Sequence, residues 1–254
     1  MSYMVDALTD ALNVLKIVAH SPGLGVSEIA RRSGYTKART YRFLLTFEAS
    51  GFVRREGDAA TYTLGAAALV IGLAAQEQVA LTQLAGKHLD ALVRRHNETA
   101  VMLVRDGLES VTVAMRGSAH EVRVQSAIGR RRSLHAGASG KVLLAFASEE
   151  LQAQVLDGPL PKLAPQTITS KTKLAKELKR TLEQGYAVSV SEGAADVVAV
   201  AAPVFDGAGQ AVASIGLTLP TSRAPEDLSA MSRSVCDAAR ELSAEMGWRG
   251  GDGG

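Results

Sequence analysis

A cluster of basic side chains lies near the N-terminal end of the 254-residue sequence. Its five members fall between Glu28 and Glu48 without an acidic residue among them: Arg31, Arg32, Lys37, Arg39 and Arg42. Residues 1–65 carry eight basic and six acidic side chains, whereas residues 66–254 carry 20 of each. The net charge of +2 therefore arises in the first quarter of the chain. A local basic cluster on an otherwise balanced protein predicts that this part binds a polyanion.

A second segment with reactive residue types is Gly-Ala-Ser-Gly-Lys at 137–141. It matches neither the G-x-S-x-G nucleophile motif nor the P-loop, because His135 stands where the P-loop has its first glycine. The five histidines are far apart and lack metal-ligand spacing. Cys236 falls among apolar residues of a predicted helix, which favours a small core residue. We therefore expect no catalytic residue, no metal site and no cofactor.

The first 50 residues are predicted to form three helices, because apolar residues recur at helical spacing. The predicted ranges are 5–20, 27–34 and 36–50. Ser27 and Thr36 are expected to cap the second and third helices with their hydroxyls, and Gly34 to end the second helix. Two short helices joined by a turn of about three or four residues are typical of a helix-turn-helix.

Two β-rich runs, at 52–56 and 61–64, flank a polar tip and predict a hairpin of the kind called a wing. An Ala- and Leu-rich helical pattern follows up to about residue 97. We predict a winged helix-turn-helix domain at residues 1–65 and a linker helix at 66–84.

The remainder predicts an α+β domain over residues 85–248. Runs of β-forming residues predict strands at 99–104, 110–115, 121–126, 186–191, 197–205 and 211–219. Helical patterns predict helices at 135–146, 149–156, 173–184 and 225–246. Short turns join several of these strands, which favours an antiparallel sheet. The Gly-rich residues 249–254 are expected to be a disordered tail.

The length allows one large domain or two modest ones, and 46% hydrophobic with 21% charged residues is typical of a globular protein. No stretch reaches the roughly 20 apolar residues that a membrane span needs. The first residues show neither the basic nor the apolar region of a secretory signal, and Cys236 has no second cysteine for an internal disulfide. We expect a cytoplasmic protein that does not contact a membrane.

Several motifs occur in a fixed order along the chain. In the first part they read VSEIA at 26–30, TYRFLLTF at 40–47, GFV at 51–53 and YTLG at 62–65. In the second part they read LHAGASGK at 134–141, GYA at 185–187 and AAPVFD at 201–206, followed by Pro220 and Arg223. Together they resemble the IclR family of bacterial transcriptional regulators. The resemblance covers about residues 6–247 and implies a GAF-like effector-binding domain after the winged helix-turn-helix.

Two positions depart from the family pattern. Tyr35-Thr36-Lys37 stands where the family usually has an apolar residue followed by Pro or Ser, and Asp196 stands where a Gly often occurs. The departure at residues 35–37 means that the family pattern does not predict which bases this helix prefers. The departure at Asp196 means that the family pattern does not predict the rim of the effector pocket.

The resemblance implies that the third helix enters the major groove of DNA. The residues expected to contact base edges are Lys37, Arg39, Thr40 and Arg42. Those expected to contact phosphates are Ser27, Thr36, Tyr41 and Arg54, with Arg55 as an alternative to Arg54. A solvated basic helix face with ordinary caps is the other interpretation, and Arg31 and Arg32 are the first residues it would apply to.

The resemblance also implies a small-molecule site between the sheet and the helix that follows the Gly-rich turn. The residues expected to form it are Val122, Val124, Ala138, Ser139, Ser189, Val197, Ala199, Gly216 and Thr218. Amides at the start of that helix favour a carboxylate, and the many small residues favour an aromatic or otherwise larger acid over one of two or three carbons. Alternatively, the small residues only let the helix pack closely on the sheet. The arginines at 130–132 either steer an anion inward or form a solvated loop.

These inferences predict a ligand-responsive repressor that senses a small organic acid and binds a pseudo-palindromic operator in double-stranded DNA. An apolar stripe on residues 65–97 favours a homodimer or a tetramer, since such a face needs a partner. Three alternatives stay open. They are an activator of the same architecture, an enzyme with an accessory DNA-binding module, and an interaction module without a ligand.

Overall fold

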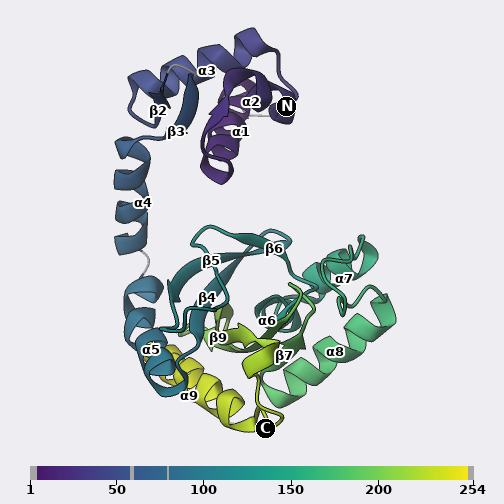
Figure 1. Cartoon of the computed structure of the whole chain (residues 1–254). Coiled ribbons are helices and arrows are strands. Elements are labelled where there is room, and N and C mark those ends of the chain that lie inside the picture. The colour runs from purple at the N-terminus through teal and green to yellow at the C-terminus, as the bar shows by residue number, and fades with distance from the viewer. Residues whose placement is uncertain (1–4, 58–59, 79, 251–254) are drawn as a thin grey trace. The chain divides into compact units, whose positions relative to one another are not determined.

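The computed structural model of the chain describes residues 5–57, 60–78 and 80–250, and its contacts divide the chain into two compact units (Figure 1). The first unit comprises Met1–Val79 and the second Ala80–Gly254. The predicted linker helix at 66–84 is divided between them, because α4 (Ala66–Gln78) belongs to the first unit and α5 (Ala80–His96) starts the second. Among the described residues, no helix is long and apolar enough to span a membrane.

The first unit packs three helices against a small antiparallel sheet. The helices are α1 (Asp6–His20), α2 (Val26–Ser33) and α3 (Lys37–Ala49). The strands are β1 (Leu24–Gly25), β2 (Val53–Glu56) and β3 (Thr61–Leu64), in the order β1-β3-β2. Six side chains form the core of this unit: Val14, Val18, Ile29, Leu44, Val53 and Tyr62. The helix-turn-helix and its wing are confirmed, whereas β1 was not predicted and residues 58–59 of the wing tip lie outside the described residues.

The two predicted helix caps differ in outcome. The Thr36 hydroxyl accepts a hydrogen bond from the Arg39 amide at 3.3 Å, so it caps α3 as predicted. Ser27 does not cap α2, because that helix already begins at Val26 and has Gly25 at its N-cap. Gly34 ends α2 in the left-handed conformation, at φ +74°.

The second unit is built on a six-stranded antiparallel sheet in the order β6-β5-β4-β9-β8-β7. The strands are β4 (Thr99–Asp106), β5 (Glu109–Arg116), β6 (Arg131–Ser133), β7 (Ala187–Val190), β8 (Val197–Phe205) and β9 (Ala211–Pro220). The helices after α5 are α6 (Ala138–Ala145), α7 (Glu149–Asp157), α8 (Lys171–Gln184) and α9 (Ser229–Glu245), with a 3-10 turn at Thr221–Arg223. The predicted α+β class with an antiparallel sheet is confirmed.

Helices cover both faces of this sheet. α5 and α9 pack on one face, over Ile215, Leu217 and other apolar side chains. α6 packs on the opposite face, with α8 behind it (Figure 1). Because side chains alternate along a strand, Thr218 of β9 points to the α6 side, where it lies beside Ala199 of β8. This face holds the candidate ligand site.

One predicted strand is absent from the described structure. Residues 121–126 form no strand and lie outside the sheet, because the outer edge of β5 pairs with β6 instead. Side chains bind the carbonyl groups of this segment in place of a neighbouring strand. The helix predicted from 135 begins at Ala138, after Gly137 at φ +83°. Arg249 and Gly250 have no regular structure, and residues 251–254 lie outside the described part of the chain.

Substitution of Gly216 on β9 tests how closely the strands of the sheet pack. A Cβ atom there would lie 2.3 Å from the Val200 carbonyl oxygen, which is backbone and cannot move aside. We predict that Gly216→Ala lowers the free energy of unfolding by about 1–3 kcal/mol, measured by urea denaturation. Gly117→Ala is the matched control, because no atom lies within 4 Å of its Cβ position. Equal effects of the two substitutions would contradict this packing.

Candidate functional site

The exposed face of α3 carries three side chains without a partner in residues 5–57. Lys37, Tyr41 and Arg42 are exposed and make no side-chain hydrogen bond or ion pair there. The opposite face packs into the core through Thr40 and Leu44, both fully buried. Residues four apart share a helix face, so Lys37 and Tyr41 lie on one line with Arg42 beside it.

Burial excludes Thr40 from this face. Its side chain has no exposed surface, and its hydroxyl has no hydrogen-bond partner among the described residues. The prediction that Thr40 contacts a base edge is therefore wrong. Its place in the helix explains this, because Thr40 is four residues before Leu44 and shares its buried face.

Arg39 and Arg54, two other predicted contacts, have partners inside the unit. The Arg39 guanidinium forms an ion pair with Asp10 of α1 and lies 5.3 Å from the centre of the Tyr35 ring. Arg54 donates to the Thr63 hydroxyl at 3.0 Å and pairs with Glu56 on the wing. These contacts tie the exposed arginines to their own unit.

The basic cluster is partly neutralised by Glu28. Its carboxylate accepts hydrogen bonds from Arg31 at 2.7 and 2.8 Å and from Arg32 at 2.7 Å. The guanidiniums of Arg31, first, and of Arg32 lower the pKa of the Glu28 carboxyl to about 2. The carboxylate is therefore charged at neutral pH and balances part of the positive charge of α2.

A cavity of about 100 Å³ lies on the α6 side of the sheet in the second unit. Its walls come from all six strands of the sheet, from residues 124–126 and from the Gly-rich turn before α6. Seven of the nine predicted ligand residues line it: Val124, Ala138, Ser139, Ser189, Val197, Ala199 and Thr218. The Gly-rich turn and strands from both halves of the sheet thus meet around one space.

Val122 and Gly216, the other two predicted residues, do not line the cavity. The Val122 side chain is 72% exposed, so it supplies no apolar wall. Gly216 lies opposite Ala201, in a row of small residues on which α6 packs through Ala138 and Val142. A Cβ atom at Gly216 would lie 2.3 Å from the Val200 carbonyl oxygen, so the close approach of β8 requires glycine there.

Four polar lining residues were not predicted. They are Ser110, Thr112, Gln125 and Ser126. Ser110 and Thr112 are both nearly fully buried and alternate along β5, so polar residues at every second position of an apolar strand were the available signal. Gln125 and Ser126 were missed because their segment was predicted to be a strand of the sheet.

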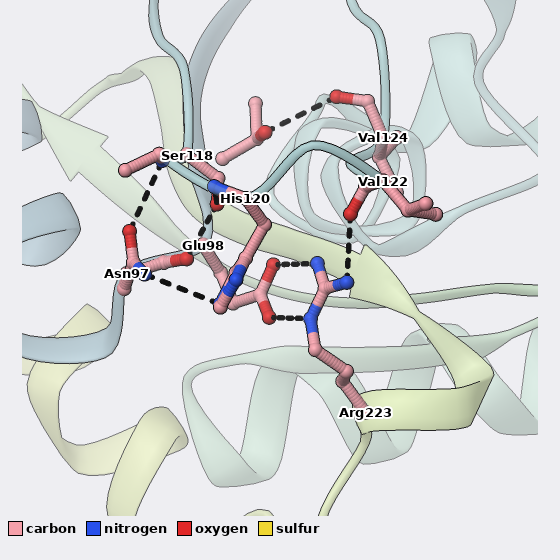
Figure 2. A network of polar contacts seen from close by, with 9 residues as sticks. Asn97, Glu98, Ser118, His120, Val122, Val124 and Arg223 are labelled. Atoms are coloured by element: carbon pink, nitrogen blue, oxygen red, sulfur yellow. Dashed lines mark hydrogen bonds and ion pairs between the residues drawn. The ribbon is translucent and has the colours of Figure 1, made fainter.

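The segment 118–126, which we call the wall segment, is held by polar contacts to the start of β4 (Figure 2). Arg223 binds the buried carboxylate of Glu98 with two hydrogen bonds of 2.6 and 2.8 Å. The same guanidinium donates to the Val122 carbonyl at 2.7 Å. Thr99 donates to the Val124 carbonyl at 3.1 Å. These bonds fix the backbone that places Val124 in the cavity.

Asn97 holds the other end of the wall segment. Its backbone carbonyl accepts from the Ser118 hydroxyl at 2.6 Å, and its side-chain oxygen accepts from the Ala119 amide at 3.1 Å (Figure 2). Asn97 has φ +48°, a conformation that asparagine adopts more readily than most residues. This turn aims its side chain at the wall segment.

Lys141 fixes the opposite side of the cavity. The side chain is fully buried on α6, and its ammonium donates to Glu177 at 2.9 Å, to Glu192 at 2.8 Å and to the Val188 carbonyl at 2.7 Å. Burial raises the pKa of the Glu192 carboxyl, although Lys141 acts in the opposite direction. The contact anchors the loop that supplies Gly193 to the cavity.

Residues 7–57 match the IclR helix-turn-helix domain, and residues 73–244 match the bacterial transcriptional regulator IclR C-terminal domain. The chain belongs to the IclR family. It is 31% identical over 240 residues to the HTH-type transcriptional regulator KipR of Bacillus subtilis, covering 94% of this chain and 96% of KipR.

The chain is also similar to a repressor and to a solved structure that contains a bound small molecule. It is 29% identical over 245 residues to the HTH-type transcriptional repressor AllR of Escherichia coli, covering 95% of this chain and 90% of AllR. The solved structure of an IclR homologue complexed with 4-hydroxybenzoate, from Microbacterium hydrocarbonoxydans, has a TM-score of 0.83. At 23% identity, over 94% of this chain and 98% of that one, it shows the shared fold. KipR and AllR are transcriptional regulators, and this chain is a transcriptional regulator of the IclR type.

The Glu98–Arg223 pair gives a test of the wall segment. We predict that Arg223→Met speeds amide hydrogen exchange in residues 119–126, because the Glu98 carboxylate and the Val122 carbonyl lose their donor. Exchange near Lys141 is expected to stay slow. Arg240→Met is the control, since its ion pair with Asp237 is exposed on α9. Unchanged exchange in the wall segment of Arg223→Met would show that this pair does not hold it.

Proposed function

We propose that this IclR regulator is a ligand-responsive repressor that binds a pseudo-palindromic operator through α3 and senses a small organic acid in the second unit. The observation that supports it most is the exposed α3 face, where Lys37, Tyr41 and Arg42 have no side-chain partner in the part of the chain that the structure describes. The proposed assignment of roles gives residues 1–65 to DNA binding, 66–84 to the linker and 85–248 to effector binding.

Lys37 and Arg42 suit recognition of base edges. Both lie in the first two turns of α3, the part of a recognition helix that enters the major groove. Arg or Lys reading a guanine gives about 1–3 kcal/mol of discrimination. The Tyr41 hydroxyl suits a phosphate, as do Ser27 and Thr36 at the starts of α2 and α3. Arg39 and Arg54 reach DNA only if they leave Asp10 and Glu56.

Apolar side chains on the first unit support a homo-oligomer. Val5, Leu8 and Leu12 follow one side of α1 and are 64%, 58% and 45% exposed. Leu69 and Val70 on α4 are both 63% exposed. A second copy would cover these faces, and a palindromic operator needs two copies. Sedimentation of the full-length chain tests this, and a monomer at micromolar concentration would contradict it.

Repression is the proposed output. AllR, a relative over nearly the whole chain, is a repressor. A regulator that occupies an operator near a promoter blocks transcription there by competing with the polymerase. We place this activity in the cytoplasm, with the chromosome. A reporter gene behind the operator tests the sign, because deletion of the regulator would raise expression under repression and lower it under activation.

The cavity supports a small organic acid as effector. Apolar side chains such as Val101 and Leu103 lie on its walls, and Ala138 and Ser139 line it at the start of α6, where helix amides favour an anion. Its volume of about 100 Å³ is below the roughly 150 Å³ of an engineered cavity that admits benzene. An acid of a few carbons therefore fits within this volume, and an aromatic acid such as 4-hydroxybenzoate needs more space than this volume gives.

Substitutions on α3 test the DNA-binding face. We predict that Lys37→Ala and Arg42→Ala each weaken binding to DNA from upstream of the chain's own gene by about 5- to 150-fold, because each removes a base or phosphate contact. Fluorescence anisotropy at fixed salt measures the affinity. Arg31→Ala, which removes a cation already paired with Glu28, is expected to change it less than threefold. If Arg31→Ala weakened binding more than the other two, the proposed face would be refuted.

A further inference from the structure

The three consecutive arginines at 130–132 face different surroundings, because side chains of a strand alternate between its two sides. Arg131 points away from the cavity and forms ion pairs with Asp106 and, at 3.0 Å, with Glu109. Arg130 and Arg132 both line the cavity. The run thus places one arginine among carboxylates and two at the wall of the candidate effector cavity.

Arg132 is the more enclosed of the two cavity arginines. Its Nη1 donates to the Gly193 carbonyl, and the structure gives it no carboxylate partner among the described residues. A guanidinium has five N–H donors, so most of its hydrogen-bonding capacity is unused. Burial, and secondarily the charge of Arg130, lowers the pKa of the Arg132 guanidinium. Both effects show that its positive charge is poorly compensated.

The cavity itself supplies no negative charge. None of its lining residues in the described part of the chain is an aspartate or glutamate. Glu192 precedes Gly193 in the loop, but its carboxylate is held by Lys141. Arg130 donates to the Gln125 carbonyl at 3.3 Å and has no carboxylate partner there either. A cation that is partly removed from water needs a counter-ion, and the cavity leaves room for one.

We propose that Arg132 is the residue that selects the effector's charge, by forming a bidentate ion pair with its carboxylate group. The proposal rests on the effector cavity of the proposed function and adds the recognition element to it. The planar guanidinium matches a carboxylate with two parallel hydrogen bonds. Without the acid, Arg132 is an uncompensated cation that opposes folding of the second unit.

The experiment compares the full-length chain with Arg132→Met and Arg131→Met. Methionine keeps much of the apolar stem and removes the charge, and Arg131 is the matched control on the same strand. The probes are acetate against acetamide and benzoate against benzamide, in sodium chloride of equal ionic strength. Thermal unfolding gives the melting temperature, and calorimetric titration gives the dissociation constant for each probe.

We expect at least one acid to raise the melting temperature of the natural chain, while its amide does not. Arg132→Met should bind that acid at least tenfold more weakly and melt at a higher temperature without ligand. Arg131→Met should bind it normally and melt at a lower temperature, because Asp106 and Glu109 lose their partner.

The outcomes separate this proposal from the proposed function. If acid and amide bind the natural chain equally, or if Arg132→Met binds the acid as tightly as the natural chain, Arg132 does not select the charge and only this proposal fails. If the natural chain binds no probe, the charge-selection proposal fails, and the effector cavity is then tested separately with neutral metabolites. Binding that Arg131→Met abolishes as fully as Arg132→Met would place the acid elsewhere and refute the proposal.

Discussion

The buried ammonium of Lys141 is the contact on which the second unit depends. It joins α6, α8, β7 and the loop before β8 through three short hydrogen bonds. Removing one partner from a buried ion pair generally costs about 3–5 kcal/mol, because the other charge stays in a medium that solvates it poorly. Lys141 thereby holds α6 close to the sheet and brings Gly137 against Gly193. The cavity is the space that remains between this anchored side and the wall segment.

Both units contain cations that are paired with internal carboxylates and cations that are not. Arg31 and Arg32 are bound by Glu28, Arg39 by Asp10 and Arg131 by Asp106 and Glu109. Lys37, Arg42 and Arg132 have no such partner among the described residues. Internal carboxylates neutralise the first group, so the proposed contacts to DNA and to an effector are assigned to the second group. A sequence shows how many cations a segment has, but only the packing shows which are already neutralised.

The sequence predicted those features that depend on local chemistry. The Thr36 cap, the Gly34 helix end and the strand-turn-strand patterns are set by residues close together in the chain. The errors arose where distant packing decides. Thr40 is polar, yet it shares the buried face of α3 with Leu44. Residues 121–126 have the composition of a strand, but β6 occupies the edge of β5 and Arg223 binds a carbonyl of the segment. Val122 was assigned to the ligand site because the same residues were predicted to form a strand. The sequence also did not show that Arg131 is paired and Arg132 is not, because the carboxylates that bind Arg131 belong to the β4–β5 hairpin.

A ligand changes DNA affinity only if it binds the two states of the regulator with different affinities, typically with a coupling of about 5- to 150-fold. The most direct test is the dissociation constant for operator DNA, measured for the natural chain and for Arg132→Met with increasing amounts of an acid that stabilises the natural chain. The account predicts at least a fivefold change for the natural chain and none for Arg132→Met at the same concentration. An operator affinity that the acid leaves unchanged in the natural chain would contradict it.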